Sequence, residues 1–271
     1  MFAPLLQNLR DRQPLVHAIT NYVTANDCAN LLLACGASPV MADDPDDAPQ
    51  ITAHAGGLVL NLGTLHRGTI PAMLACGRIA AQRGLPVVLD PVGVGASTLR
   101  TDTALQLLRE VPIAVIRGNL SEVETLTRGH GGAPGVDSTQ SITPDNLEGC
   151  GALARELARR TGAVVALTGA VDLVTDGDTL YCLHNGHPMM GSVTGTGCQL
   201  SCLVGAFAAA NPDSLLSATA AAVSAMGLCG EIAHRRLGPE DGNGSYRTYL
   251  LDAVYRLTPD QLEKGARYEL R

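Results

Sequence analysis

The stretch best suited to chemistry is the glycine-rich segment 191–200, which reads Gly-Ser-Val-Thr-Gly-Thr-Gly-Cys-Gln-Leu. The chain that follows is uncharged and rich in helix formers, which predicts a buried helix over about 196–211. A helix that begins on glycines presents free backbone N–H groups and the positive end of its dipole, and glycine leaves space for an oxygen atom beside them. We therefore expect an anion hole there, with an ordinary glycine-rich loop before a core helix as the alternative. The residues of this predicted anion hole are Gly195, Thr196, Gly197 and Cys198.

Two carboxylates stand where apolar runs end or helices begin. Asp90 closes the run 85–90, and Glu122 comes three residues after Asn119 in Asn-Leu-Ser-Glu. Mg²⁺ prefers a few carboxylates together with water and phosphate oxygens, so this pair suits a nucleotide-associated metal site. The alternative is an N-cap aspartate and a solvated helix glutamate.

Two further residues, the cation Arg117 and the hydroxyl-bearing Thr168, also stand at the ends of apolar runs. Arg117 ends the run 113–117 and has the planar fork that binds phosphate oxygens bidentately, although a structural ion pair is an equally ordinary role. Thr168 ends the run 163–168 and can donate its hydroxyl to a phosphate, or can simply cap the strand.

Several familiar motifs are absent from the sequence. It contains no G-x-x-x-x-G-K-[ST], no G-x-G-x-x-G after a first strand, no H-E-x-x-H and no G-x-S-x-G. His184 and His187 flank an Asn-Gly turn, where a surface position is expected.

The composition narrows the class of protein. The chain has 271 residues, which suits one large α/β domain over 1–271, and its 46% hydrophobic but 3% aromatic content predicts a core of Ala, Val, Leu and Ile. The formal net charge is −7 and the only adjacent basic pairs are 159–160 and 235–236, which argues against a nucleic-acid partner. The apolar region 200–230 is broken by Asn-Pro-Asp at 211–213, so we expect two core helices and no membrane span. Eight cysteines without a C-x-x-C pair, and a start without an export signal, favour a cytoplasmic protein.

Short Val/Leu/Ile runs alternate with helical segments, which predicts a mostly parallel sheet with helices on both faces. Strands are expected at 14–21, 57–63, 85–90, 113–117 and 163–168, with a hairpin over 173–183 and another strand before Met41. Helices are expected at 3–12, 21–35, 69–83, 101–110 and 144–161, with a short one after Asn119 and a mobile loop over 128–138.

Ligands of such sheets bind beyond the carboxyl ends of the strands. The chemically interesting residues follow the predicted strands in turn, a concentration that turn chemistry alone does not explain. They are Asn21, Met41, Asn61, Gly63, Asp90, Arg117, Asn119, Thr168 and Gly169.

These motifs together resemble the hydroxyethylthiazole kinase family of thiamine biosynthesis, within the ribokinase-like superfamily. The resemblance covers most of the chain. It is carried, in order, by His-Ala-Ile-Thr-Asn-Tyr-Val (17–23), Met-Ala-Asp (41–43), Asp-Pro-Val-Gly-Val-Gly (90–95), Arg-Gly-Asn-Leu-Ser-Glu (117–122), Gly-Thr-Gly-Cys (195–198) and Leu-Asp-Ala (251–253).

The resemblance implies phosphorylation of the primary hydroxyl of 4-methyl-5-(2-hydroxyethyl)thiazole by ATP with Mg²⁺, in a homotrimer whose active sites are shared between subunits. Carried over by motif, the implied substrate contacts are Met41, Gly195 and Asn21, and the implied ATP contacts are Arg117, Thr168 and Asn119. The implied metal ligands are Asp90 and Glu122.

Cys198 is the implied catalytic residue, and it departs from the wider superfamily, in which most members have aspartate there. A loose transition state for phosphoryl transfer needs little deprotonation before attack, so we expect Cys198 to orient the hydroxyl and to assist weakly. Two other functions stay open: a kinase for another small alcohol of the pyrimidine or sugar type, and a non-catalytic nucleotide-binding relative.

Overall fold

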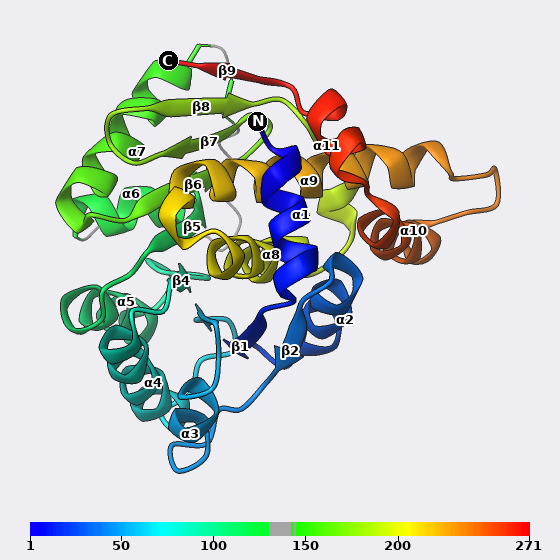
Figure 1. Ribbon diagram of the computed structural model, residues 1–271. Coiled ribbons are helices and arrows are strands. Elements are labelled where there is room, and N and C mark those ends of the chain that lie inside the picture. Colours follow the sequence, from blue (N-terminus) through cyan, green and yellow to red (C-terminus); the bar gives the residue numbers. More distant parts are fainter. Residues whose placement is uncertain (130–141, 144) are drawn as a thin grey trace.

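The computed structural model describes residues 1–129, 142–143 and 145–271, and within them nine strands form one sheet in the order β2-β1-β3-β4-β5-β6-β7-β8-β9 (Figure 1). The strands from β2 to β6 pair in parallel, whereas β7, β8 and β9 pair antiparallel. The predicted α/β class with a mostly parallel sheet is therefore confirmed, as is the hairpin. Most of the loop predicted over 128–138 lies outside the described residues. The strands are β1 (Leu15–Ile19), β2 (Ser38–Val40), β3 (Gly57–Asn61), β4 (Val87–Asp90), β5 (Val115–Asn119), β6 (Val164–Thr168), β7 (Asp172–Thr175), β8 (Leu180–Leu183) and β9 (Tyr268–Leu270).

The register of the parallel strands places their polar ends side by side. Asn61 at the end of β3 is opposite Asp90 at the end of β4. Asn119 at the end of β5 is likewise opposite Thr168 at the end of β6. Because parallel strands all finish at one edge of the sheet, these side chains share the edge at which ligands of such folds bind.

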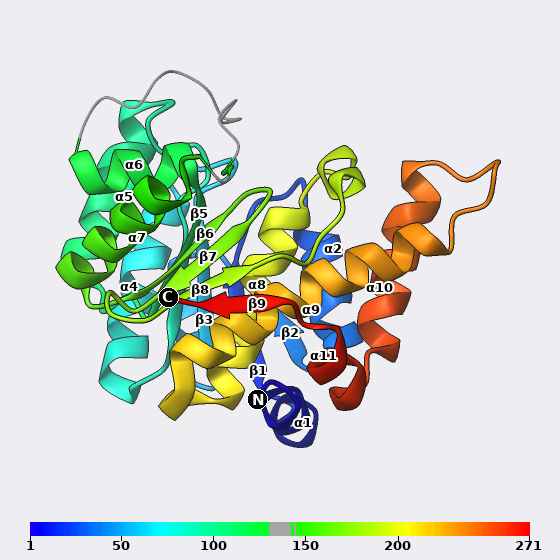
Figure 2. The same ribbon diagram turned by 90° about the horizontal axis from the view of Figure 1, so that it is seen from above.

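Helices cover both faces of the sheet, with α4 to α7 on one side and α1, α2, α8, α9, α10 and α11 on the other (Figure 2). Successive strand residues point to opposite faces, so Leu58 and Leu60 enter one core while Val59 enters the other. The helices are α1 (Ala3–Arg12), α2 (Ala25–Cys35), α3 (Ala48–Thr52), α4 (Thr69–Arg83), α5 (Thr98–Glu110), α6 (Leu120–Arg128), α7 (Leu147–Thr161), α8 (Thr196–Ala210), α9 (Leu215–Arg235), α10 (Asn243–Arg256) and α11 (Pro259–Gly265), with 3₁₀ turns η1 (Pro188–Ser192) and η2 (Pro212–Ser214).

Helix α8 is the central helix of its face and packs on β1, β3 and β4. Glycine at 205 permits the close approach, because a Cβ there would lie 2.7 Å from Val59 Cγ2. The segment Pro212–Arg235 is the one described stretch whose length and hydropathy would allow a membrane span, but 72% of its apolar window is buried inside the protein. The apolar region 200–230 thus forms two core helices, as predicted.

Some boundaries differ from the predicted ones. The helix predicted over 21–35 begins at Ala25 because a turn occupies 22–24, and the one predicted over 101–110 begins at Thr98, where Ser97 accepts the Arg100 N–H as an N-cap. The helix predicted over 144–161 begins at Leu147. Elements α3, α10, α11 and β9 have no counterpart in the predicted pattern. Strand β9 has only three residues and pairs antiparallel with β8, and its Tyr268 ring contacts Phe2 at 5.0 Å and Tyr181 at 5.6 Å.

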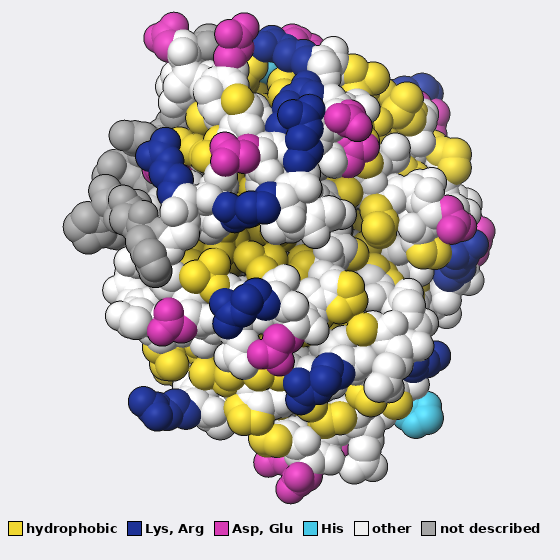
Figure 3. Space-filling model, turned by 90° about the vertical axis from the view of Figure 1, so that its left-hand side faces the viewer, with side chains coloured by type: hydrophobic (Ala, Val, Ile, Leu, Met, Phe, Trp, Pro, Cys, Tyr) yellow, Lys and Arg dark blue, Asp and Glu magenta, His cyan; other side chains and the backbone are white. Residues whose placement is uncertain are grey.

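The surface over α4 to α7 carries mixed charge. Figure 3 shows Arg side chains interspersed with Asp and Glu, and apolar side chains emerging between them in a shallow hollow. On the described part of this face no continuous basic area is visible, in keeping with the net charge of −7.

Candidate active site

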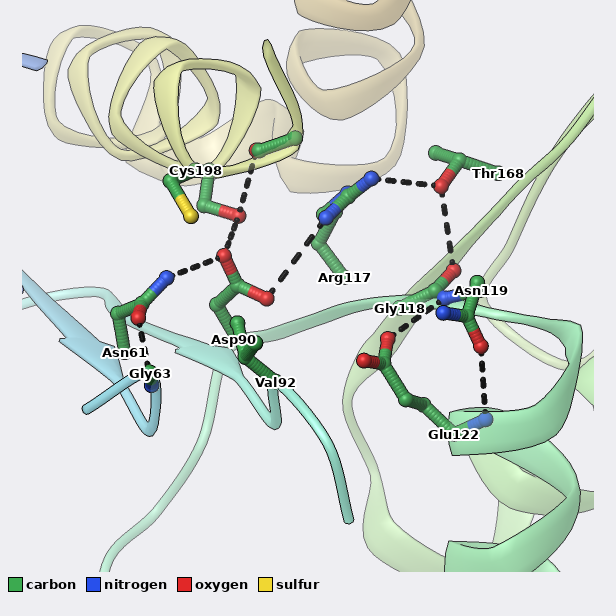
Figure 4. Close-up of polar contacts among 12 residues, drawn as sticks. Asn61, Gly63, Asp90, Val92, Arg117, Gly118, Asn119, Glu122, Thr168 and Cys198 are labelled. Atoms are coloured by element: carbon green, nitrogen blue, oxygen red, sulfur yellow. Dashed lines mark hydrogen bonds and ion pairs between the residues drawn. The ribbon is translucent and has the colours of Figure 1, made fainter. Parts of the chain in front are cut away.

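Polar side chains from neighbouring strand ends and from the first turns of α8 converge at the carboxyl edge of the sheet. Figure 4 shows Asp90 between Asn61 and Arg117, with Cys198 approaching from α8 and Thr168 on the far side of Arg117. The residues come from four separate strands and one helix, so only the tertiary fold brings them together.

Asp90 is the fully buried centre of this group. Its Oδ2 accepts hydrogen bonds from Asn61 Nδ2 at 2.6 Å and from Ser201 Oγ at 2.8 Å. Its Oδ1 lies 3.7 Å from Arg117 Nη1 and has no hydrogen-bond donor among the described residues. Burial raises the pKa of Asp90, while the charge of Arg117 and the two hydrogen bonds oppose that rise.

Arg117 joins Asp90 to Thr168. Its Nη2 donates to Thr168 Oγ1 over 2.8 Å, so the two residues predicted to contact ATP lie together. The guanidinium also lies against the start of α8, because a Cβ at Gly197 would be only 2.7 Å from Arg117 Nη1. Glycine at 197 thus leaves space for the cation beside the helix terminus, and a side chain there would displace the guanidinium.

The start of α8 has the geometry of an anion site. Gly195 is the N-cap residue with φ +84°, and a Cβ there would lie 2.3 Å from Thr24 Cγ2, so both backbone strain and space demand glycine. The first N–H bonded back into this turn is that of Gln199, which donates to Gly195 O at 2.9 Å. The earlier amides, those of residues 196–198, therefore point beyond the helix end, where an anion would also meet the positive end of the dipole.

Cys198 lies in the first turn of α8. It is partly exposed, whereas the other seven cysteines are buried, and all eight are free thiols. Its Sγ accepts a hydrogen bond from Asn21 Nδ2 at 3.3 Å. Burial, followed by the charge of Asp90, raises the pKa of Cys198, so the residue is a thiol at neutral pH.

Glu122 and Asn119 form the capping box of α6. Asn119 Oδ1 accepts the Glu122 N–H at 3.0 Å, and Glu122 Oε2 accepts the Asn119 N–H at 2.9 Å. Glu122 Oε1 accepts the Gly93 N–H at 3.0 Å, which ties the loop after β4 to α6. Glu122 is consequently buried and not a solvated helix glutamate. Asn119 has a structural role in this box, and its predicted contact with ATP stays a prediction.

The two carboxylates fit a divalent cation. Burial and then the charge of Asp90 raise the pKa of Glu122, so these groups are close enough to repel, and a cation between them would favour both charged forms. Asp90 Oδ1 lacks a hydrogen bond from any part of the chain that the structure describes. No cluster of three or more His, Cys, Asp or Glu occurs in the described residues, so water and phosphate oxygens would complete the ligand set.

Two cavities flank this group. One, of 170 Å³, is lined by residues that include Thr20, Met41, Asn61, His66 and Met73. Its wall combines apolar side chains such as Met41 and Met73 with polar ones such as Thr20, Asn61 and His66, which suits a small heterocycle.

The other cavity has a volume of 670 Å³, which is enough for a larger ligand. Its wall includes Arg117, Thr168, Thr196 and Gly197 at one end and Asp172, His187 and Met226 elsewhere. Asp90 contacts Asn61 in the wall of the smaller cavity and Arg117 in the wall of the larger one.

Some residues of the site were missed from the sequence. The sequence predicts Asn61 only as a residue at the end of a strand, with no role of its own. Ser201 has no predicted role, although a serine three positions after Cys198 in an apolar helix was an available signal. Asp172, whose Oδ1 accepts the Gly169 N–H at 2.9 Å, lines the larger cavity.

The two turn histidines have different environments. His184 is exposed, as expected. His187 is only partly exposed, because its ring stacks on His234 with centroids 3.6 Å apart, and it lines the larger cavity.

The architecture, with its site at the carboxyl ends of the parallel strands, defines an α/β protein of the ribokinase-like class. The chain superposes on the pyridoxal kinase of Staphylococcus aureus, solved in complex with AMP-PCP and pyridoxal, with a TM-score of 0.60 over 95% of this chain and 98% of that one. The sequence identity is 13%, so this likeness concerns the fold alone.

Within that class the chain belongs to the hydroxyethylthiazole kinase family, whose sequence profile matches residues 6–260. The hydroxyethylthiazole kinase of Clostridium acetobutylicum is 50% identical over 271 residues, covering 99% of both chains. The solved structure of the hydroxyethylthiazole kinase from Pyrococcus horikoshii OT3 is 36% identical, with a TM-score of 0.89 over 100% of this chain and 98% of that one. The family resemblance seen in the motifs is therefore confirmed.

Proposed function

We propose that this protein phosphorylates the primary hydroxyl of 4-methyl-5-(2-hydroxyethyl)thiazole with ATP. The observation that carries the proposal is the link through Asp90 between Asn61, in the wall of the 170 Å³ cavity, and Arg117, in the wall of the 670 Å³ cavity, beside the open amides of α8. A small alcohol in the first cavity and a triphosphate in the second would then lie on the two sides of this linked group. Membership of the hydroxyethylthiazole kinase family supports this choice of substrates.

The role proposed for each site residue follows from the cavity that it lines or adjoins. Met41 lines the smaller cavity and would contact the thiazole ring, with Gly195 at the neighbouring helix end. Arg117 and Thr168 line the larger cavity and would bind phosphate oxygens. The amides of residues 196–198 would stabilise negative charge on the transferred phosphoryl group, which is the main protein contribution to this type of reaction. Cys198 would orient the acceptor hydroxyl.

Asp90 and Glu122 would hold Mg²⁺, because a cation would favour the charged forms of two carboxylates that burial disfavours. When bound, the ion supplies neutralisation of phosphate charge. Arg117 supplies part of the same compensation on the protein side, since its Nη1 lies 3.7 Å from Asp90.

A cytoplasmic homotrimer with shared active sites is the assembly that we propose. Tyr22, which lines the smaller cavity, is 81% exposed, and its neighbour Val23 is 56% exposed. Exposed apolar side chains at the mouth of a binding cavity are what a neighbouring subunit would cover.

The proposed function is tested by an ADP-release assay with ATP and Mg²⁺ over a panel of alcohols. The panel contains the thiazole alcohol, the same thiazole without its hydroxyl, a hydroxymethylpyrimidine and a sugar. Turnover with the thiazole alcohol alone is expected. Preference for the pyrimidine or the sugar would identify another small-alcohol kinase, and ATP binding without any turnover would identify a non-catalytic relative.

A further inference from the structure

A continuous chain of side-chain hydrogen bonds leads from Asp90 to Cys198. Asn61 Nδ2 donates to Asp90 Oδ2 at 2.6 Å, and Asn21 Nδ2 donates to Asn61 Oδ1 at 3.1 Å. Asn21 Nδ2 also donates to Cys198 Sγ at 3.3 Å. Asn61 and Asn21 are 1% and 5% exposed, so water does not compete for these bonds as it would at the surface.

Backbone N–H donors fix the orientation of the side-chain amides of Asn61 and Asn21. Asn61 Oδ1 accepts the Gly63 N–H at 2.8 Å, so its Nδ2 must face Asp90. Asn21 Oδ1 accepts the Thr24 N–H at 3.2 Å, so its Nδ2 must face Asn61 and Cys198. A backbone N–H can only donate, and therefore neither amide can be reversed without leaving a buried donor unpaired.

Both hydrogens of the Asn21 amide are used within the protein, one on Asn61 Oδ1 and one on Cys198 Sγ. The sulfur is thereby held as an acceptor, and its own proton must point elsewhere. Substitution at Asn21 should consequently act on the properties of the thiol.

We propose that Asn21 and Asn61 are positioning residues, which form a relay anchored on Asp90 that holds the Cys198 sulfur as a hydrogen-bond acceptor in the first turn of α8. The proposal rests on the proposed function for its catalytic consequence only. In this proposal Asn21 does not donate a hydrogen bond to the substrate, as the family resemblance implied, because both N–H groups of its amide are already used within the protein. Donation to sulfur favours the thiolate, which opposes the effects of burial and of the Asp90 charge on the pKa of Cys198.

The test measures the rate at which iodoacetamide alkylates Cys198 as a function of pH, in the full chain without substrates, by mass spectrometry of the peptide that contains it. Asn21→Asp keeps the acceptor for Thr24 but removes the N–H donated to sulfur. We expect its alkylation rate at pH 8 to fall roughly tenfold, with the profile displaced to higher pH. Asn21→Ala is the second variant, with a smaller displacement in the same direction, and serves if the aspartate variant does not fold.

Ser201→Ala is the matched control. It removes the other hydrogen bond to Asp90 Oδ2, at 2.8 Å, but leaves the amide chain intact. Its alkylation profile should stay within about twofold of wild type, whereas Asn61→Leu should displace the profile as Asn21→Ala does. Equal displacement by Ser201→Ala and Asn61→Leu would mean general loosening of the site and would overturn the relay. So would an Asn21→Asp profile that overlaps the wild-type profile.

Steady-state kinetics give a second readout. The relay predicts that Asn21→Ala lowers kcat while KM for the acceptor alcohol changes less than about threefold, because the amide acts on sulfur and not on substrate. A rise of KM with unchanged kcat would instead assign Asn21 to substrate binding and overturn the proposal. Alkylation needs no substrate, so the relay can stand even if the thiazole alcohol proves not to be the acceptor.

Discussion

Arg117 Nη1, in the wall of the larger cavity, lies 3.7 Å from the buried Oδ1 of Asp90, whose other oxygen is bonded by Asn61 in the wall of the smaller cavity. A buried carboxylate is costly unless a charge and hydrogen bonds compensate it, and Arg117, Asn61 and Ser201 supply that compensation. The consequence is that these three residues oppose, before any ligand binds, the rise in the pKa of Asp90 that burial causes.

The first prediction concerns the metal. Glu122→Gln removes the charge of one carboxylate and should lower kcat by about 100-fold, because less Mg²⁺ charge is held at the phosphates. The thiazole alcohol binds in the other cavity, so its Kd from calorimetry should change less than about threefold. Kinetics at several Mg²⁺ concentrations and calorimetry together check this.

The control for Glu122→Gln is Glu124→Gln on the same helix, where the glutamate pairs with Arg128 near the surface and should leave kcat unchanged. Glutamine keeps one oxygen for the two backbone donors of Gly93 and Asn119, so a stability loss of about 1–2 kcal/mol is also expected. If the affinity for the thiazole alcohol fell as much as kcat, Glu122 would act on the acceptor alcohol and not at the metal site.

The second prediction concerns assembly. Tyr22, Val23 and Leu33 are large apolar side chains exposed near or on α2, and a neighbouring subunit would bury them. Light scattering at micromolar concentration should give about three times the chain mass of 28.1 kDa. Tyr22→Ala should weaken the assembly and raise KM for the thiazole alcohol together. A fully active monomer would refute a shared site.

The third prediction concerns the pH dependence of stability. Burial raises the pKa of Asp172 from 3.8 to about 7, and the hydrogen bond from the Gly169 N–H opposes part of that rise. Between these two pH values the folded state binds more protons than the unfolded state, so the Asp172 contribution is full below pH 4 and is lost as pH rises through about 7. Asp172→Asn should therefore match wild type at pH 4 and exceed it above pH 7 by about 1–2 kcal/mol, a value reduced because part of the residue surface meets solvent.

Urea unfolding of both proteins between pH 4 and pH 8 measures this difference. The amide oxygen that Asp172→Asn introduces still accepts the Gly169 N–H, so the comparison isolates the charge. A constant difference across the pH range would show that Asp172 does not titrate in the folded protein.

Much of the fold could be predicted from the sequence, because continuous Val and Leu runs between helices leave few alternatives to a parallel sheet. The ends of these strands could be predicted from the same runs, and with them the convergence of Asp90, Arg117 and Thr168. The domain organisation of 1–271 as one unit stays a prediction, supported by one sheet that includes both β1 and β9. Strand β9 itself was not predictable, since three residues carry little pattern and its contacts, the pairing with β8 and the rings of Phe2 and Tyr181, come from distant parts of the chain.

The connections within the site were not predictable for a different reason. The register of β3 against β4 decides that Asn61 faces Asp90, and the packing of α8 decides that Ser201 reaches the same oxygen. Neither relation leaves a mark in local sequence. The double role of Glu122, which caps α6 and also ties down Gly93, likewise appears only when two loops are brought together.

The last prediction concerns Cys198. Aspartate there would be a stronger acceptor for the substrate hydroxyl, and Asn21 Nδ2, which now donates to sulfur at 3.3 Å, could donate to the new carboxylate. The added charge near Asp90 and the phosphates is a cost that Mg²⁺ and Arg117 would offset. We expect Cys198→Asp to keep or raise kcat, and Cys198→Ala to lose roughly 10- to 10³-fold.

Steady-state kinetics of both variants at saturating ATP decide between the roles of the thiol. Cys229→Ala is the matched control, because that cysteine is buried in α9 and lines neither cavity. Loss in Cys198→Ala together with full activity in Cys198→Asp would mean that an acceptor at this position matters and sulfur itself does not. If Cys198→Ala turned over like wild type, the residue would only begin the helix. Catalysis would then depend on positioning, on the metal and on the amides of residues 196–198.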